Sequence, residues 1–89
     1  MKRTTDEIRY LMLKILNNKQ KYNVESVRKE IGTGLPSILQ NAENLEIFGF
    51  IKTNEVNIGK RKYRELEITE EGKKFFDILR KKYENGFRH

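Results

Sequence analysis

Apolar residues recur at helical spacing in the first half of the chain and predict three consecutive helices. The first covers residues 5–17 and begins with a Thr-x-x-Glu capping box formed by Thr4 and Glu7. The apolar stripe that it would bury consists of Ile8, Leu11, Met12, Ile15 and Leu16. A short second helix follows the N-cap candidate Asn23, and the Gly-Thr-Gly segment at 32–34 ends it.

The third predicted helix has two faces of opposite character. It begins near Pro36, which fits the first turn of a helix because its missing N–H is not needed there, and it ends at Gly49. Its apolar stripe consists of Ile38, Ala42, Leu45 and Phe48. Its polar stripe consists of Ser37, Gln40, Asn41 and Asn44. The pattern predicts one face buried in the core and another that meets solvent or a partner.

The second half of the chain changes to the period of a β-hairpin before a final helix. The stretches 50–56 and 63–69 predict two strands, and the second alternates apolar and charged residues. The segment 57–62, which contains Gly59, predicts the loop between them. A last helix would begin after Thr69, its N-cap. Its large apolar residues are Phe75, Phe76, Ile78, Leu79 and Tyr83.

The order of these elements indicates an α+β fold. Parallel strands need a long crossover connection, which a hairpin does not provide. Three helices can instead pack as a helix-turn-helix against a two-stranded β-hairpin wing, followed by a C-terminal helix. We expect a single domain over residues 1–89. Its parts would be an N-terminal arm (1–4), a core (5–69), a C-terminal helix (70–85) and a tail (86–89).

Three segments occur in the order typical of one family of small proteins. Residues 24–32 read Val-Glu-Ser-Val-Arg-Lys-Glu-Ile-Gly, residues 45–51 read Leu-Glu-Ile-Phe-Gly-Phe-Ile, and residues 68–73 read Ile-Thr-Glu-Glu-Gly-Lys. They resemble the second helix, the join between recognition helix and first wing strand, and the start of the last helix in winged helix-turn-helix proteins. That superfamily contains small prokaryotic DNA-binding regulators, including those of archaea and their viruses. The resemblance implies that the third helix enters the major groove of DNA.

The polar stripe of the third helix is the candidate base-reading surface. Asn and Gln can bind adenine through two hydrogen bonds in the major groove, and Ser can serve several bases. We therefore assign base reading to Ser37, Gln40, Asn41 and Asn44. No lysine or arginine lies between residues 35 and 48, so the helix lacks the usual partner of guanine. The alternative is an ordinary solvated helix face.

Adjacent cations in the predicted hairpin loop form the candidate phosphate-binding surface, which consists of Lys60, Arg61 and Lys62. Their mutual repulsion gains nothing for the fold, and a phosphate backbone would relieve it. The alternative is a charged hairpin edge that resists aggregation. Further phosphate-binding candidates are Arg28 and Lys29 in the second helix and Lys2 and Arg3 in the N-terminal arm.

The last predicted helix carries more large apolar side chains than one helix face buries in a small domain. We expect Phe75 and Ile78 to face the core. The neighbouring stripe, Phe76, Leu79 and Tyr83, would then form the interface of a two-fold homodimer. The alternative is that this helix only completes a wide core face within the monomer.

Composition narrows the range of possible functions. The chain contains no cysteine, and its single histidine is residue 89. Most nucleophilic, metal and acid–base sites are thus unavailable, so we expect no enzyme activity, cofactor, metal or small-molecule ligand. No apolar run has the length of a membrane span or the form of a signal peptide, which indicates a cytoplasmic protein.

These features predict sequence-selective binding to double-stranded DNA by a transcriptional regulator. The net charge of +6 on 89 residues suits a polyanionic partner. Two other functions remain open: a winged-helix module that binds another protein, and a non-specific chromatin or RNA-binding protein. Selective binding to duplex DNA separates the first function from both alternatives.

Overall fold

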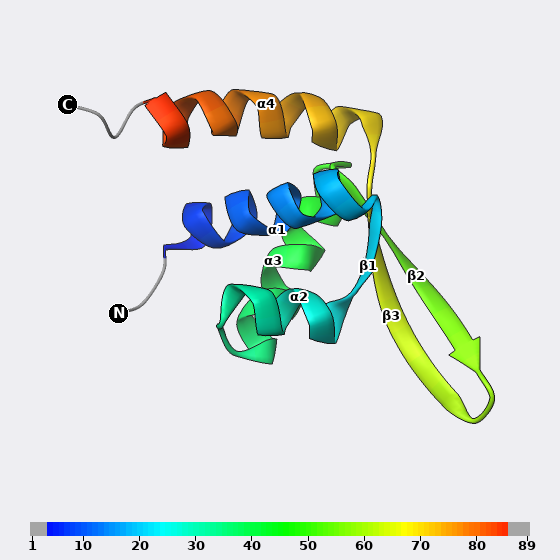
Figure 1. Ribbon diagram of the computed structural model, residues 1–89. Coiled ribbons are helices and arrows are strands. Elements are labelled where there is room, and N and C mark those ends of the chain that lie inside the picture. The colour runs from blue at the N-terminus through cyan, green and yellow to red at the C-terminus, as the bar shows by residue number, and fades with distance from the viewer. Residues whose placement is uncertain (1–3, 86–89) are drawn as a thin grey trace.

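The computed structural model describes residues 4–85, which form four helices and one antiparallel sheet (Figure 1). In chain order the elements are α1 (Thr5–Lys19), β1 (Lys21–Asn23), α2 (Val24–Ile31), α3 (Leu35–Ile47), β2 (Ile51–Ile58), β3 (Arg61–Ile68) and α4 (Glu70–Asn85). In Figure 1, α4 lies along α1 on one side of the domain, α2 and α3 lie on the other side, and the β2–β3 hairpin projects outward. The predicted order of helices and hairpin is confirmed.

Helix α1 forms the centre of the domain. The Thr4 side chain accepts a hydrogen bond from the Glu7 backbone N–H at 3.1 Å, as the capping motif predicts. The buried face of α1 is wider than its apolar stripe, because Tyr10 and Leu13 are buried as well. Tyr10 lies on the flank that α4 covers, since its ring stacks on Phe76 and Tyr83, whereas Leu11 is only partly buried.

The sheet contains a short strand that the sequence pattern did not indicate. Strand β1 pairs antiparallel with residues 65–67 of β3, so the strand order is β1-β3-β2. Gln20 joins α1 to β1 with a positive φ of 68°, and its carbonyl accepts a hydrogen bond from the Ile68 N–H at 3.2 Å. Three residues are too few to show an alternating pattern, so only the pairing with β3 reveals β1 as a strand.

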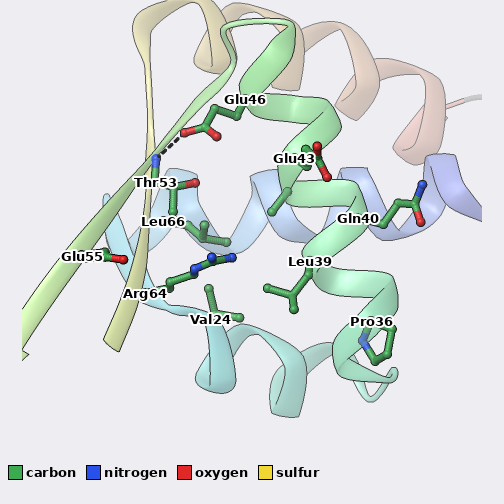
Figure 2. A pocket seen from close by; sticks show the side chains of 11 residues that line it. Val24, Pro36, Leu39, Gln40, Glu43, Glu46, Thr53, Glu55, Arg64 and Leu66 are labelled. Atoms are coloured by element: carbon green, nitrogen blue, oxygen red, sulfur yellow. Dashed lines mark hydrogen bonds between the residues drawn. The ribbon is translucent and has the colours of Figure 1, made fainter. Parts of the chain in front are cut away.

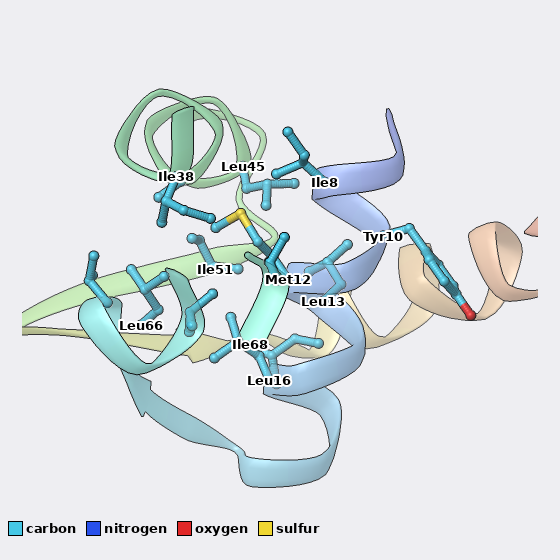
Figure 3. Close-up of a cluster of buried hydrophobic side chains, with 14 of the residues drawn as sticks. Ile8, Tyr10, Met12, Leu13, Leu16, Ile38, Leu45, Ile51, Leu66 and Ile68 are labelled. Atoms are coloured by element: carbon cyan, nitrogen blue, oxygen red, sulfur yellow. The ribbon is translucent and has the colours of Figure 1, made fainter. Parts of the chain in front are cut away.

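The core lies where α1, α2, α3 and the root of the sheet meet (Figure 3). Its fully buried large side chains are Met12, Leu13, Leu16, Val27, Ile38, Leu45, Ile51 and Leu66. The prediction that Phe48 belongs to this core is wrong, because Phe48 is 59% exposed. Helix α3 ends before it, and a hydrogen bond from the Phe50 N–H to the Leu45 carbonyl turns the chain toward β2. The Phe48 ring therefore packs on the Phe50 ring at the surface, 5.8 Å between centroids.

Helix α4 packs on α1 through the stripe that we predicted to lie outside the core, whereas Phe75, predicted to face the core, is partly buried against it. Phe76 is buried and stacks on Tyr10 with ring centroids 5.8 Å apart, and Tyr83 stacks on the same ring at 4.7 Å. Leu79 packs against the core as well, whereas Ile78 is 66% exposed. Assigning Phe76, Leu79 and Tyr83 to a dimer interface was therefore wrong, since these residues join α4 to α1 within one chain.

A close contact at Gly72 sets the rotation of α4. A Cβ atom at this position would overlap the Phe50 carbonyl oxygen and lie 2.9 Å from Ile68 Cγ1. Helix α4 thus starts in direct contact with the backbone that leads into β2. The Thr69 hydroxyl caps the helix by accepting from the Gly72 N–H at 3.0 Å, and it donates to the Gly49 carbonyl at 2.7 Å. The Thr69–Gly49 hydrogen bond and the close approach of Gly72 to Phe50 join the first turn of α4 to the segment between α3 and β2.

The hydroxyl of Tyr10 is held within the α1–α4 contact. It donates to the Glu84 carboxylate at 3.2 Å, close to the end of α4. Burial, followed by this hydrogen bond, raises the pKa of Tyr10 above its ordinary value of 10.0. The hydroxyl therefore stays protonated at neutral pH and keeps its carboxylate partner.

Candidate nucleic-acid interface

Helix α3 presents one continuous stripe of side chains to solvent. Pro36 lies in its first turn, and the preceding Gly32 adopts a left-handed conformation that ends α2 and redirects the chain. Gln40 is exposed, and the two other polar candidates, Ser37 and Asn44, are half-buried at its flank. The spacings of three and four residues place these side chains on one face.

Asn41 does not belong to this exposed stripe. It is 5% exposed and lies between α3 and α1. Its Oδ1 accepts from Arg9 Nε at 3.2 Å, and its Nδ2 donates to the Ser37 carbonyl at 2.8 Å. The predicted base-reading role of Asn41 is therefore corrected, because its amide is used in the contact between the two helices. Asn41 follows the buried Ile38 by three residues, which turns it toward the core.

Ile47 is a candidate that sequence reasoning missed. It is 74% exposed and lies seven residues after Gln40, on the same stripe of α3. An exposed apolar side chain beside polar ones suits contact with the methyl group of thymine. The heptad spacing from Gln40 was visible in the sequence, but Ile47 also fitted a helix end packed into the core.

A groove of about 790 Å³ separates α3 from the hairpin (Figure 2). Its walls carry three carboxylates, Glu43 and Glu46 from α3 and Glu55 from β2, against one cation, Arg64 from β3. The Glu46 carboxylate accepts from the Thr53 N–H at 3.1 Å and so fastens α3 to β2. Gln40 of α3 lines the same groove (Figure 2). The groove itself is therefore a poor place for phosphate groups.

The hairpin is longer and its turn is tighter than the sequence pattern predicted. The strands include Ile58 and Arg61, and only Gly59 and Lys60 remain as a two-residue turn. Gly59 supplies the positive φ, 61°, that such a turn requires at its first position. The predicted loop over residues 57–62 was therefore too long, because polar residues at a hairpin tip can pair across strands without an apolar pattern.

The tight turn spreads the three wing cations apart. Lys60 lies in the turn itself, and Arg61 and Lys62 follow as neighbours in β3, so their side chains point to opposite faces of the hairpin. All three are exposed. Among the residues that the structure describes, none of the three forms an ion pair. The hairpin tip thus presents positive charge in several directions.

The other predicted phosphate-binding residues differ in their surroundings. Arg28 donates to the Glu25 carboxylate at 3.0 and 3.1 Å, so part of its charge is compensated within α2. Lys29 is exposed on the same helix. Lys2 and Arg3 lie outside the described residues.

Within residues 4–85, no group of three or more His, Cys, Asp or Glu residues has a geometry that could hold a metal ion. None of the described helices combines the length and apolar character needed to cross a membrane.

No protein-family model matches the chain. Over 63 residues the chain is 44% identical to the phenylalanine–tRNA ligase alpha subunit of Sulfolobus acidocaldarius. The match covers 71% of this chain and 12% of that subunit, so the chain corresponds to a small part of this relative.

Solved structures of regulators share the arrangement of helices and hairpin. A transcriptional regulator homologue from Pyrococcus horikoshii is 24% identical, with a TM-score of 0.72 over 92% of this chain and 84% of its own. A PadR-family transcription regulator from Clostridium difficile is 19% identical, with a TM-score of 0.77 over 86% of each chain. At these identities the likeness concerns the fold, and it confirms the predicted architecture.

Proposed function

We propose that this chain, which has the winged helix-turn-helix fold, binds double-stranded DNA selectively as a transcriptional regulator. One observation carries the proposal. The exposed stripe of α3 offers side chains that can hydrogen-bond to base edges, and the hairpin tip offers three cations without carboxylate partners in the described part of the chain. Contacts to bases determine the sequence that is bound, and contacts to phosphates position the protein on the duplex. In this chain the candidate base-reading side chains lie on α3 and the candidate phosphate-binding side chains lie on the hairpin tip.

In this arrangement α3 enters the major groove and the wing holds the phosphate backbone. Gln40 would bind adenine through its amide, and Ser37 and Asn44 would contact neighbouring bases. Ile47 would contact a thymine methyl group at the other end of the stripe. The carboxylates of Glu43 and Glu55 would repel phosphates from the groove between α3 and the hairpin, which limits contact to these two surfaces.

Selection of bound duplexes from a random pool tests this function. We expect enrichment of a defined motif that contains adenine or thymine, because the exposed α3 stripe carries amides and an isoleucine but no arginine. Binding without any enriched motif would support the non-specific chromatin-like alternative. Absence of binding to any duplex at low salt would contradict the proposal.

Replacing Gln40 by alanine tests the base-reading role of α3. We expect Gln40→Ala to weaken binding to the selected site by roughly 1–3 kcal/mol, while binding to unrelated duplexes changes little. Asn18→Ala removes an amide that is also exposed, on α1, and is the matched control. Fluorescence anisotropy titrations on both duplexes measure the difference. An equal loss on the two duplexes would assign Gln40 to the phosphate backbone.

The likeness to the alpha subunit of a tRNA ligase favours a second candidate, binding to structured RNA. The same basic wing could follow an RNA backbone, since phosphate contact does not depend on sequence. Competition between a DNA duplex and folded tRNA for the labelled protein separates the two candidates. Preference for tRNA at equal salt would replace the DNA-binding proposal.

We also propose that the chain forms a homodimer, through a different surface from the one predicted from the sequence. Phe48, Phe50 and Phe75 form a row of ring contacts, with the Phe50 and Phe75 centroids 4.3 Å apart. Ile78 extends this row along α4, three residues after Phe75. Two of its four members are more than half exposed. A second copy of the chain would cover this apolar row.

Sedimentation at micromolar concentration tests the dimer. We expect twice the mass of one chain for the wild-type protein and a single chain for Ile78→Glu, because the new carboxylate would be buried at the interface. Asp77→Lys changes an exposed residue of the same helix that points about 100° away from Ile78, and it should leave the mass unchanged. A wild-type monomer would refute the dimer without bearing on DNA binding.

A further inference from the structure

The tip of the β2–β3 hairpin carries an exposed apolar residue among cations. Ile58 is the last residue of β2 and is 65% exposed. It lies opposite Arg61 in the strand register and directly before the turn formed by Gly59 and Lys60. A single exposed isoleucine is common on protein surfaces and has no meaning alone. Here the isoleucine lies among three cations, so a polyanion attracted to the tip would come into contact with its side chain.

Ile58 ends an apolar strip on the outer face of the hairpin, the face turned away from the core. Val56 and its cross-strand partner Tyr63 lie on the same face, since residues two apart in a strand point the same way. A shallow hollow of about 160 Å³ runs beside these side chains. Strand β1 ends at Asn23, opposite Glu65, so the last pair, Ile58 and Arg61, extends beyond the three-stranded part of the sheet.

The minor groove of duplex DNA matches both the shape and the charge of this tip. The groove is about 6 Å wide, narrower than a two-stranded hairpin with its side chains, so only side chains at the end of the hairpin can enter it. Lys60 and Lys62 would then meet the phosphates on its rims. Ile58, at the end of the strand, would reach toward the base pairs. Apolar side chains that enter the minor groove commonly wedge between bases and bend the duplex.

We propose that Ile58 is a wedge that enters the minor groove and partly unstacks one base step, bending the DNA toward the major groove. The inference rests on the proposed DNA binding and identifies Ile58 as a specificity-determining residue. TA and CA steps deform more easily than others, so the wedge favours sites that carry such a step under the wing tip. Arg61, the cross-strand partner of Ile58, neutralises a phosphate beside the bent step.

The experiment measures the bend directly. Duplexes labelled at both ends carry the selected site with either a TA or an AA step under the wing, and energy transfer reports their end-to-end distance. We expect wild-type protein to bend the TA duplex by roughly 20–40°. Ile58→Ala should leave the duplex straight and lower affinity for the TA site about fivefold to twentyfold, with an unchanged salt slope. Ile58→Leu, which keeps an apolar wedge, should retain the bend.

Asn57→Ala is the matched control, because Asn57 is exposed at the same tip but on the opposite face of the hairpin. We expect it to keep both the bend and the TA preference. A bend that survives Ile58→Ala would overturn the wedge and leave DNA binding in place. A wild-type protein that binds no duplex at low salt would overturn the proposed function itself. Weaker binding of Ile58→Ala to folded tRNA alone would also overturn the wedge, because the RNA minor groove is wide and shallow.

Discussion

Replacing Lys60, Arg61 and Lys62 together by alanine is expected to weaken binding to every duplex by about two orders of magnitude at 0.1 M salt. Each phosphate contact releases counterions, so the slope of log affinity against log salt should also become flatter by about 2.7 for three contacts. The three side chains are exposed and make no ion pair within residues 4–85, so the variant should fold normally. Anisotropy titrations at four or five salt concentrations measure both quantities.

A variant with the same loss of charge elsewhere provides the control. Lys74, Lys81 and Lys82 are exposed on α4, which lies along α1 and not on the hairpin (Figure 1). Replacing these three by alanine should leave the salt slope nearly unchanged. If the wing variant lost affinity only for the selected site, with the slope intact, the wing would read bases and the roles of wing and α3 would be exchanged.

Gly72→Ala is expected to destabilise the fold by about 3 kcal/mol, although alanine normally favours a helix over glycine. The added Cβ would overlap the Phe50 carbonyl oxygen, which is backbone and cannot rotate away. Helix α4 would have to move, disturbing the Thr69 cap and the stacking of Phe75 on Phe50. Thermal unfolding followed by circular dichroism should show a midpoint lower by roughly 12–24 °C.

Gly34→Ala is the matched glycine substitution. Gly34 has a φ of −73°, and a Cβ there would lie 3.7 Å from Pro36 Cδ, an ordinary contact. We expect a loss of about 1 kcal/mol, because alanine is a poorer N-cap than glycine but meets no close contact here. Equal destabilisation by the two substitutions would show that α4 does not depend on its close approach to β2.

The α+β architecture could be predicted from the sequence, because its signals are local. Helix starts depend on nearby groups, and the caps at Thr4, Asn23 and Thr69 each accept a backbone hydrogen bond as predicted. The periods of 3.6 and 2 identify helix and strand without knowledge of their neighbours. The exposed position of Gln40 followed from the same periodicity, since the apolar stripe of α3 had to face the core.

The errors share one physical cause: each concerns a face or an end whose neighbour is distant in sequence. Asn41 is polar, yet it turns inward because Arg9 of α1 supplies a hydrogen-bond donor there. Phe48 is apolar, yet its side chain is exposed, because α3 ends at Ile47 and the chain turns toward β2. Strand β1 exists only because the edge of β3 accepts it. No local pattern encodes these contacts.

Helix α4 shows which features the local sequence determines and which depend on tertiary contacts. Its existence, its start and its amphipathic character were evident from the chain, since they depend on residues within a few positions of one another. The rotation of α4 about its axis could not be predicted from the sequence, because Phe75 and Phe76 lie on two apolar faces about 100° apart. The fit of Gly72 against the Phe50 backbone and the stacking of Tyr10 on Phe76 select one of them. Both contacts join elements far apart in the chain, so the choice between the two faces belongs to the assembled domain.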